Sequence, residues 1–141
     1  MKSLDPNEGE GKEILRIVHG SFLKELKTEE KAQDAMARLA AVVKEPGAKL
    51  LHIDDCVFLI LVRGKTLVEV HTMAIKEDSL ALAKSFVKLT KYLKAIGVKL
   101  AYTYTNDPKY EIIAKRTKLP FRKQNLQLED GSQYTAYSVV L

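Results

Sequence analysis

The chain of 141 residues is poor in the residues that build disulfide frameworks and metal sites, with one cysteine, three histidines and no tryptophan. The single cysteine excludes a disulfide within the chain. Cys56 lies in an apolar run, so we expect a buried, unreactive thiol. The histidines lack both zinc-ligand spacing and cysteine partners, so we expect no metal site. No apolar run approaches the roughly 20 residues of a membrane-spanning helix.

The first residues also lack the features of a targeting segment. Residues 1–11 are acidic and polar, with no apolar centre, so they do not resemble a secretory signal. We expect them to form a disordered arm. Residues 12–141 contain no linker, repeat or low-complexity segment, and we expect a single domain that is not secreted.

Positive charge is concentrated in one part of the chain. Residues 76–123 hold 12 Lys and Arg against 4 Asp and Glu, whereas the net charge of the whole chain is only +5. Such a surface favours phosphates, acidic protein partners, self-association through the basic surface, or non-specific nucleic acid. The structural alternative, which we favour, is a solvated lysine-rich helix face. The basic residues that we expect to form the surface are Lys84, Lys88, Lys91, Lys115, Arg116 and Lys118.

Apolar residues recur at helical spacing in four segments. The predicted helices are Lys12–Leu26, a segment capped by Thr28 and stopped by Pro46-Gly47, Ser79–Ile96 and Pro108–Lys118. Gly97 ends the third helix, as is usual at a helix C-terminus. In the third helix we expect Phe86 and Leu89 to be buried and Lys88 to face solvent.

Short runs rich in β-branched and aromatic residues predict six strands. They are Lys49–Ile53, Val57–Val62, Thr66–Ile75, Val98–Thr105, Asn125–Leu128 and Gln133–Leu141. The continuous apolar character of the second strand is typical of a central strand covered on both faces. The element order is ααβββαβαββ, which predicts an α/β fold with helices on both faces of a mixed sheet.

From Lys12 to Leu141 this order resembles the GNAT (acyl-CoA N-acyltransferase) superfamily, without its usual first strand. Ala95-Ile96-Gly97-Val98 precedes a strand, Asn106 ends that strand, and Leu119-Pro120-Phe121 opens a closing hairpin after a short helix. The resemblance implies a single-domain GNAT-like α/β fold. It also implies that two parallel strands splay apart, so that the pantetheine arm of acyl-CoA pairs with exposed backbone between them.

The resemblance assigns candidate cofactor-binding residues. Met73, Ala74 and Ile75 would supply the pairing backbone groups, and Ser79 and Leu80 would begin the helix that faces the pyrophosphate. We place Asn106 with them, because it ends the second of the two parallel strands.

Three departures from GNAT enzymes argue against catalysis, and the first of them also argues against cofactor binding. The turn from Ile75 to Leu80 contains no glycine, and Glu77 and Asp78 place negative charge where the pyrophosphate would lie. Lys115 or Arg116 stands where a tyrosine often protonates the departing sulfur, and Leu119-Pro120-Phe121 lacks the usual glycine. We therefore expect no bound cofactor, with acetyl-CoA as the alternative.

One catalytic option remains. Glu69 and His71 alternate along a predicted strand and so share one face. Either could take the proton of an amine nucleophile, directly or through water. The structural alternative, which the sequence favours, is that Glu69 is paired on the sheet and His71 is an ordinary strand histidine.

The missing glycines decide the functional interpretation. Short, glycine-poor GNAT-like chains resemble those of tailed bacteriophages, some of which are virion proteins. The leading interpretation is therefore a non-catalytic structural or interaction protein, phage virion- or assembly-associated, on a degenerate GNAT-like fold, located in the cytoplasm or virion. The first alternative is a divergent acetyl-CoA-dependent N-acyltransferase, and the second is a small basic nucleic-acid-associated protein.

Overall fold

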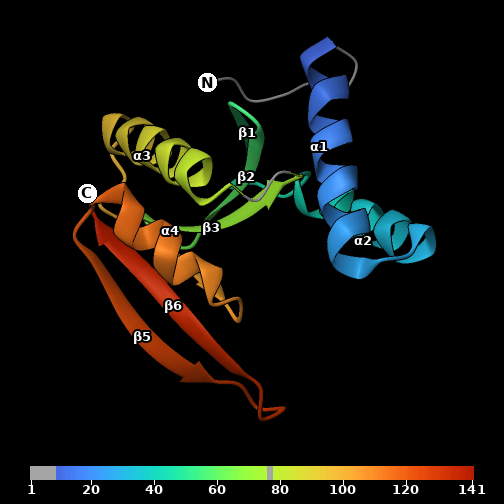
Figure 1. Cartoon of the computed structure of the whole chain (residues 1–141). Coiled ribbons are helices and arrows are strands. Elements are labelled where there is room, and N and C mark those ends of the chain that lie inside the picture. Colours follow the sequence, from blue (N-terminus) through green and yellow to red (C-terminus); the bar gives the residue numbers. More distant parts are fainter. Residues whose placement is uncertain (1–8, 76–77) are drawn as a thin grey trace. The chain divides into compact units, whose positions relative to one another are not determined.

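The computed structural model describes residues 9–75 and 78–141 (Figure 1). The elements follow the predicted order. The helices are α1 (Gly9–Leu26), α2 (Glu29–Val42), α3 (Ser79–Ala95) and α4 (Lys109–Thr117). The strands are β1 (Ala48–Ile53), β2 (Cys56–Val62), β3 (Leu67–Ala74), β4 (Leu100–Thr105), β5 (Phe121–Gln127) and β6 (Gln133–Val140).

The strands form one mixed sheet in the order β1-β2-β3-β4-β6-β5. β3 and β4 pair in parallel and are joined through α3, whereas β1–β2, β4–β6 and β5–β6 pair antiparallel. A parallel pair needs such a crossover connection, and a helix is the usual one. The predicted α/β class and element order are confirmed.

The chain forms two compact units, which are described separately. Among the described residues, unit 1 comprises 9–61 and 71–75, and unit 2 comprises 62–70 and 78–141. The boundary divides β3 after Val70. Glu69 therefore belongs to unit 2 and His71 to unit 1.

In unit 1, α1 packs against α2 and both contribute to a core with the strands. The buried members of that core are Ile14, Ile17, Val18, Val57, Leu59 and Met73. The first five residues of β2 are all buried, which confirms the prediction of a strand covered on both faces. Cys56 is one of them and is 3% exposed, so the expected buried thiol is also confirmed.

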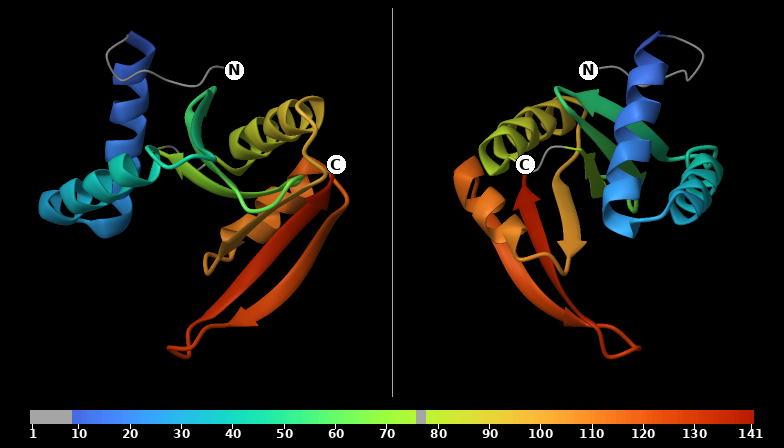
Figure 2. Two further views of the ribbon diagram at one scale, coloured as in Figure 1. Left: turned by 180° about the vertical axis from the view of Figure 1, so that it is seen from behind. Right: turned by 45° about the vertical axis from the view of Figure 1, so that its right-hand side comes forward.

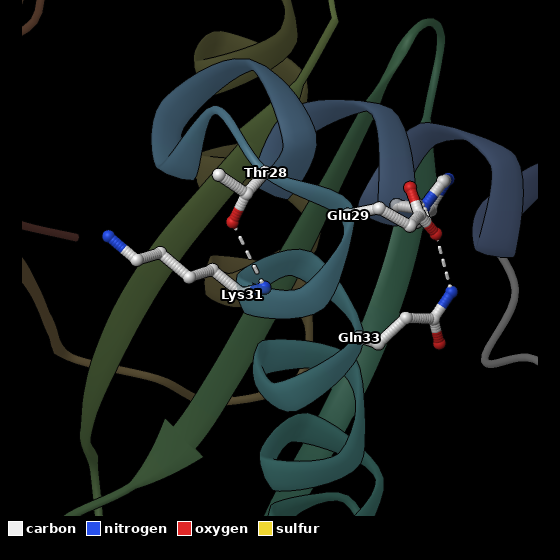
Figure 3. A network of polar contacts seen from close by, with 5 residues as sticks. Thr28, Glu29, Lys31 and Gln33 are labelled. Carbon is white, nitrogen blue, oxygen red and sulfur yellow. Dashed lines mark hydrogen bonds and ion pairs between the residues drawn. The ribbon is translucent and has the colours of Figure 1, made fainter.

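The predicted cap of the second helix is present. The backbone N–H of Lys31 donates to Thr28 Oγ1 at 3.3 Å (Figure 3). In the same turn the Gln33 amide donates to Glu29, whose carboxylate also contacts His19 of α1. Together these bonds fix the start of α2 next to the end of α1.

Replacing Thr28 with alanine should destabilise the protein by about 1 kcal/mol, because an N–H at the start of α2 loses its acceptor. Chemical denaturation measures the change. Thr28→Ser keeps the hydroxyl and should retain most of the stability. Equal losses in both variants would mean that the methyl group, and not the cap, stabilises this turn.

In unit 2, α3 and α4 pack against each other and against the sheet. Leu82, Leu89, Leu93 and Ile113 are buried there, which confirms the prediction for Leu89. The prediction of a fully buried Phe86 is wrong, since its side chain is only half-buried. Phe86 stacks edge-on against Tyr110, with 6.4 Å between ring centroids, and lines an apolar cavity of about 80 Å³. The side chains of α3 and α4 do not completely fill the space between the helices, so the Phe86 ring stays partly accessible to solvent.

The terminal hairpin is longer than the sequence indicated (Figure 2). β5 begins at Phe121, four residues before the predicted start at Asn125. Its residues 122–125 are polar and exposed, which suits a strand at the end of the sheet order because charged side chains discourage pairing with other chains. Alternating hydrophobicity is absent from such a strand, so the sequence pattern missed it.

Two other predicted boundaries also shift. α1 includes residues 9–11, which we had assigned to a disordered arm; residues 1–8 lie outside the described part of the chain. β4 begins at Leu100 and not at Val98, because the Val98 N–H bonds to the Leu93 carbonyl and closes α3. Gly97 has φ +97°, the left-handed conformation expected at the end of a helix.

Candidate functional site

A buried carboxylate is the central feature of the candidate site in unit 2. Glu69 is 5% exposed. The Tyr102 hydroxyl donates to its Oε1 at 2.9 Å, and Arg63 Nε donates to the same oxygen at 3.1 Å. Burial of a carboxylate is costly unless it is paired and hydrogen-bonded, and these two donors meet that need.

The backbone explains how these three residues meet. The backbone N–H groups of Arg63 and Gly64 donate to the Leu67 carbonyl, so a tight turn joins β2 to β3. Glu69 lies two residues beyond Leu67 on the same strand face. Tyr102 is the register partner of Glu69 in the parallel β3–β4 pair.

The same row of the sheet continues through two more strands. Tyr102 pairs with Ser138 of β6, and Ser138 pairs with Arg122 of β5. Directly paired residues point to the same sheet face. Glu69, Tyr102, Ser138 and Arg122 therefore form a polar row across unit 2, and the pair on one side of it on the same face, Leu100 and Val140, is apolar.

Electrostatic effects keep both donors protonated. Burial raises the pKa of the Tyr102 phenol, and its hydrogen bond to Glu69 raises it further. The hydrogen bond and charge of Glu69 raise the pKa of the Arg63 guanidinium. Both groups therefore donate to Glu69 throughout the neutral pH range.

The two base candidates differ in their surroundings. The predicted pairing of Glu69 is confirmed, although its side chain is buried and does not lie on an open surface. His71 begins the part of β3 that belongs to unit 1, and it is half-buried. The donors Tyr102 and Arg63 bond to Glu69, and all three residues lie in unit 2.

The start of α3 is occupied by its own cap. The carboxylate of Asp78 accepts from the Leu80 N–H at 2.9 Å and from the Ala81 N–H at 3.4 Å. These are amides that a helix N-terminus would otherwise offer to a phosphate. Glu77, the second acid of the predicted repulsive pair, lies outside the described residues.

The three predicted pairing residues at the end of β3 lie in unit 1. The Met73 side chain is 5% exposed and belongs to the core, while Ala74 and Ile75 are half-buried. The Ile75 carbonyl accepts a hydrogen bond from the Lys24 ammonium of α1 at 2.9 Å. That carbonyl therefore already has a donor, which the sequence did not indicate.

The remaining predicted cofactor residues lie in unit 2. Ser79 is half-buried and Leu80 is 47% exposed. Asn106 is exposed in the loop after β4, where Thr105 Oγ1 accepts from the Asp107 N–H at 3.1 Å and Asp107 accepts from the Lys109 N–H at 3.0 Å. The neighbours of Asn106 thus bind the backbone and hold the loop that presents it.

The predicted basic residues are all exposed in unit 2. They are Lys84, Lys88 and Lys91 of α3, Lys115 and Arg116 of α4, and Lys118 after it. Their binding to an acidic partner or to nucleic acid stays a prediction. Tyr104 of β4 packs edge-on against Tyr134 of β6, with 5.9 Å between ring centroids.

Residues 9–75 and 78–141 contain no group of three or more side chains arranged to hold a metal ion. Within the same ranges, no helix combines the length and the apolar character needed to cross a membrane. The location of the protein stays a prediction.

Comparison with known proteins gives matches to solved structures alone. No protein-family model matches the chain, and no curated protein matches its sequence. A variant of the spermidine N-acetyltransferase SpeG from Vibrio cholerae matches with a TM-score of 0.69 and 10% identity, covering 99% of this chain and 93% of that one.

Two further structures have different acceptors in their names. An aminoglycoside 6′-N-acetyltransferase from Enterococcus faecium matches with a TM-score of 0.63 and 14% identity, covering 99% of this chain and 95% of that one. RimL, a ribosomal alpha-N-protein acetyltransferase in complex with coenzyme A, matches with a TM-score of 0.64 and 10% identity, covering 99% of this chain and 92% of that one. The chain has the GNAT acetyltransferase fold.

The leading interpretation from the sequence is corrected by these matches. The similar structures are acetyltransferases for spermidine, aminoglycosides and ribosomal protein. They favour the acetyltransferase alternative over a non-catalytic phage structural protein, and they give the phage resemblance no support. The glycine-poor turn was given too much weight, because one loop can diverge while the surrounding fold is retained.

Sequence reasoning missed three sets of interactions made by the candidate residues. They are the Arg63 and Tyr102 donors to Glu69, the Lys24 bond to Ile75, and the Asp78 cap. The cap had a signal, since aspartate before a helix is a preferred N-cap. The other two depend on strand register and on the packing of α1, which the pattern of residues does not specify.

Proposed function

We propose that this protein is an acyl-CoA-dependent N-acyltransferase that uses acetyl-CoA as donor and an amine as acceptor. The observation that carries the proposal is the match of 99% of the chain to acetyltransferases of three acceptor classes. One of these is in complex with coenzyme A. The sequence had led us to expect no cofactor, and the proposal adopts the acetyl-CoA alternative.

Glu69 is the proposed proton acceptor. N-acetyl transfer forms a C–N bond, breaks the thioester C–S bond and requires the amine to lose a proton. Glu69 is a buried carboxylate whose orientation is fixed by two donors, which favours it over His71. The proton passes to Glu69 directly or through one water, and the departing thiolate is protonated from solvent.

The proposed donor-binding residues fit acetyl-CoA unequally. Backbone groups of Met73 and Ala74 stay candidates for the pantetheine arm, and Asn106 stays a candidate at the end of β4. Ser79 and Leu80 fit the pyrophosphate poorly, because Asp78 takes up amide donors there and adds a negative charge. We therefore expect acetyl-CoA to bind weakly, with a dissociation constant of about 1 mM or somewhat below, about −4 to −5 kcal/mol.

Calorimetric titration of the full chain with acetyl-CoA tests this proposal. Saturable binding of acetyl-CoA would support the proposal if desulfo-CoA, which cannot donate an acetyl group, binds in the same way. If binding does not saturate at acetyl-CoA concentrations up to 10-fold above the expected dissociation constant, the proposal is contradicted. Subsequent assays of thiol release should include spermidine, an aminoglycoside and a peptide with a free N-terminus, the acceptor classes of the similar structures.

Replacing Asp78 with asparagine should tighten acetyl-CoA binding by about 5-fold, or roughly 1 kcal/mol. Asparagine caps a helix about as well as aspartate does, so the fold is retained while the negative charge is removed. The measurement is the calorimetric dissociation constant of the variant and of the wild type.

Acetyl-pantetheine provides the matched control, because it has the thioester arm but no pyrophosphate. Its affinity should not change in Asp78→Asn. If acetyl-pantetheine gains as much as acetyl-CoA, Asp78 does not act on the phosphates. If neither gains, the start of α3 does not lie near the bound donor.

A further inference from the structure

We propose that Arg63 and Tyr102 are positioning residues for Glu69, and that Arg63 sets the pH at which Glu69 can accept a proton. The inference rests on the proposed function, in which Glu69 is the base. Neither residue touches substrate in this account. Both act through the carboxylate that they contact.

The geometry gives each residue a separate task. Tyr102 lies beside Glu69 in the parallel register and reaches Oε1 from the neighbouring strand. Arg63 reaches the same oxygen from the β2–β3 turn. Two donors from different elements restrict rotation of the carboxylate, and both use acceptor capacity of the same oxygen, Oε1.

Arg63 differs from Tyr102 in charge. A guanidinium in contact with a carboxylate favours the ionised form, whereas a neutral phenol contributes a hydrogen bond without a charge. The Arg63 side chain is 49% exposed and that of Glu69 is 7% exposed. The base is thus shielded from solvent, and the group that controls its charge remains partly solvated.

The β2–β3 turn and the polar row place further polar groups of unit 2 on the same side of the sheet as Glu69. Arg63 comes from the turn, Tyr102 from β4 and Ser138 from β6. Arg122 ends the row on β5, three strand spacings or about 14 Å from Glu69 at the backbone. Arg122 is exposed, so solvent and salt screen its charge at that distance.

The pH dependence has a definite sign. An opposite charge in contact lowers the pH at which a carboxyl group ionises, so loss of Arg63 must raise it. An enzyme whose base is Glu69 loses activity as pH falls and the carboxylate becomes protonated. The acid limb of the kcat/KM profile therefore moves to higher pH when Arg63 is neutralised.

The first experiment measures pH profiles of kcat/KM for the wild type and four variants. Arg63→Gln should move the acid limb upward by about one pH unit, and Tyr102→Phe should move it upward by less. Arg63→Lys keeps a cation and should stay near the wild type, as should the distant control Arg122→Gln. An unmoved limb in Arg63→Gln, or an equal shift in Arg122→Gln, would overturn the inference.

The second experiment does not depend on turnover. Carbon-13 NMR follows the Glu69 carboxyl during a pH titration, with Glu69→Gln used to assign the signal. In Arg63→Gln the midpoint should rise by about the same one pH unit. An unchanged midpoint in a folded variant would refute control by Arg63. Absence of acyl transfer to any amine would instead count against the proposed function, and the NMR result would still decide the inference.

Discussion

Replacing Glu69 with glutamine should lower kcat/KM for amine acetylation by about 100-fold or more, the usual contribution of a positioned general base. Glutamine has nearly the same shape and can still accept from Tyr102 and Arg63, but it cannot take up a proton. The KM for acetyl-CoA should change little. Initial rates of thiol release at saturating amine and varied acetyl-CoA provide the measurement.

His71→Gln is the comparison for that result, because His71 is the other candidate on the same strand. We expect its activity to remain within a few-fold of the wild type. If His71→Gln loses 100-fold and Glu69→Gln does not, the proton acceptor is His71 and the Glu69 arrangement is structural. If both fall together, the strand as a whole must hold its position for catalysis.

Replacing Leu89 with alanine should destabilise the protein by about 2–5 kcal/mol, through lost apolar burial and the cavity that remains. Leu89 is 2% exposed on α3 and lines the apolar cavity between α3, α4 and the sheet of unit 2. That existing cavity limits collapse around the new space. Chemical denaturation followed by circular dichroism measures the change in the free energy of unfolding.

Lys88→Ala is a matched control one residue away. Lys88 is exposed, and surface substitutions usually change stability by less than about 0.5 kcal/mol. The difference between the two variants should therefore exceed about 1.5 kcal/mol. Similar losses in both would mean that α3 packs against the sheet through a different face.

The fold could be predicted because its strongest signals are local. Leu82, Leu89 and Leu93 repeat at helical spacing and are all buried, and Gly97 ends their helix in the expected conformation. The apolar run of β2 correctly predicted a covered strand. The start of β5 was predicted four residues too late, because an edge strand with four consecutive polar residues has no alternating pattern to detect.

The candidate site could be predicted only in part. Glu69 was selected from its strand position, but its partners Arg63 and Tyr102 are set by register and by the β2–β3 turn. The register and the turn depend on which strands pair and at which residues they meet. The functional interpretation failed for a related reason, since the missing glycines describe one loop whereas the whole-chain comparison describes the fold.

The proposed transfer of an acetyl group to an amine is tested most directly by incubating the full chain with acetyl-CoA and a mixture of amines and measuring the products. Mass spectrometry identifies N-acetylated products, and a thiol reagent measures released coenzyme A. We expect equal amounts of N-acetylated product and released coenzyme A, both greatly reduced in Glu69→Gln. Acetylation of no amine above the uncatalysed rate by the wild type, or product formation by Glu69→Gln as fast as by the wild type, would refute the proposed function.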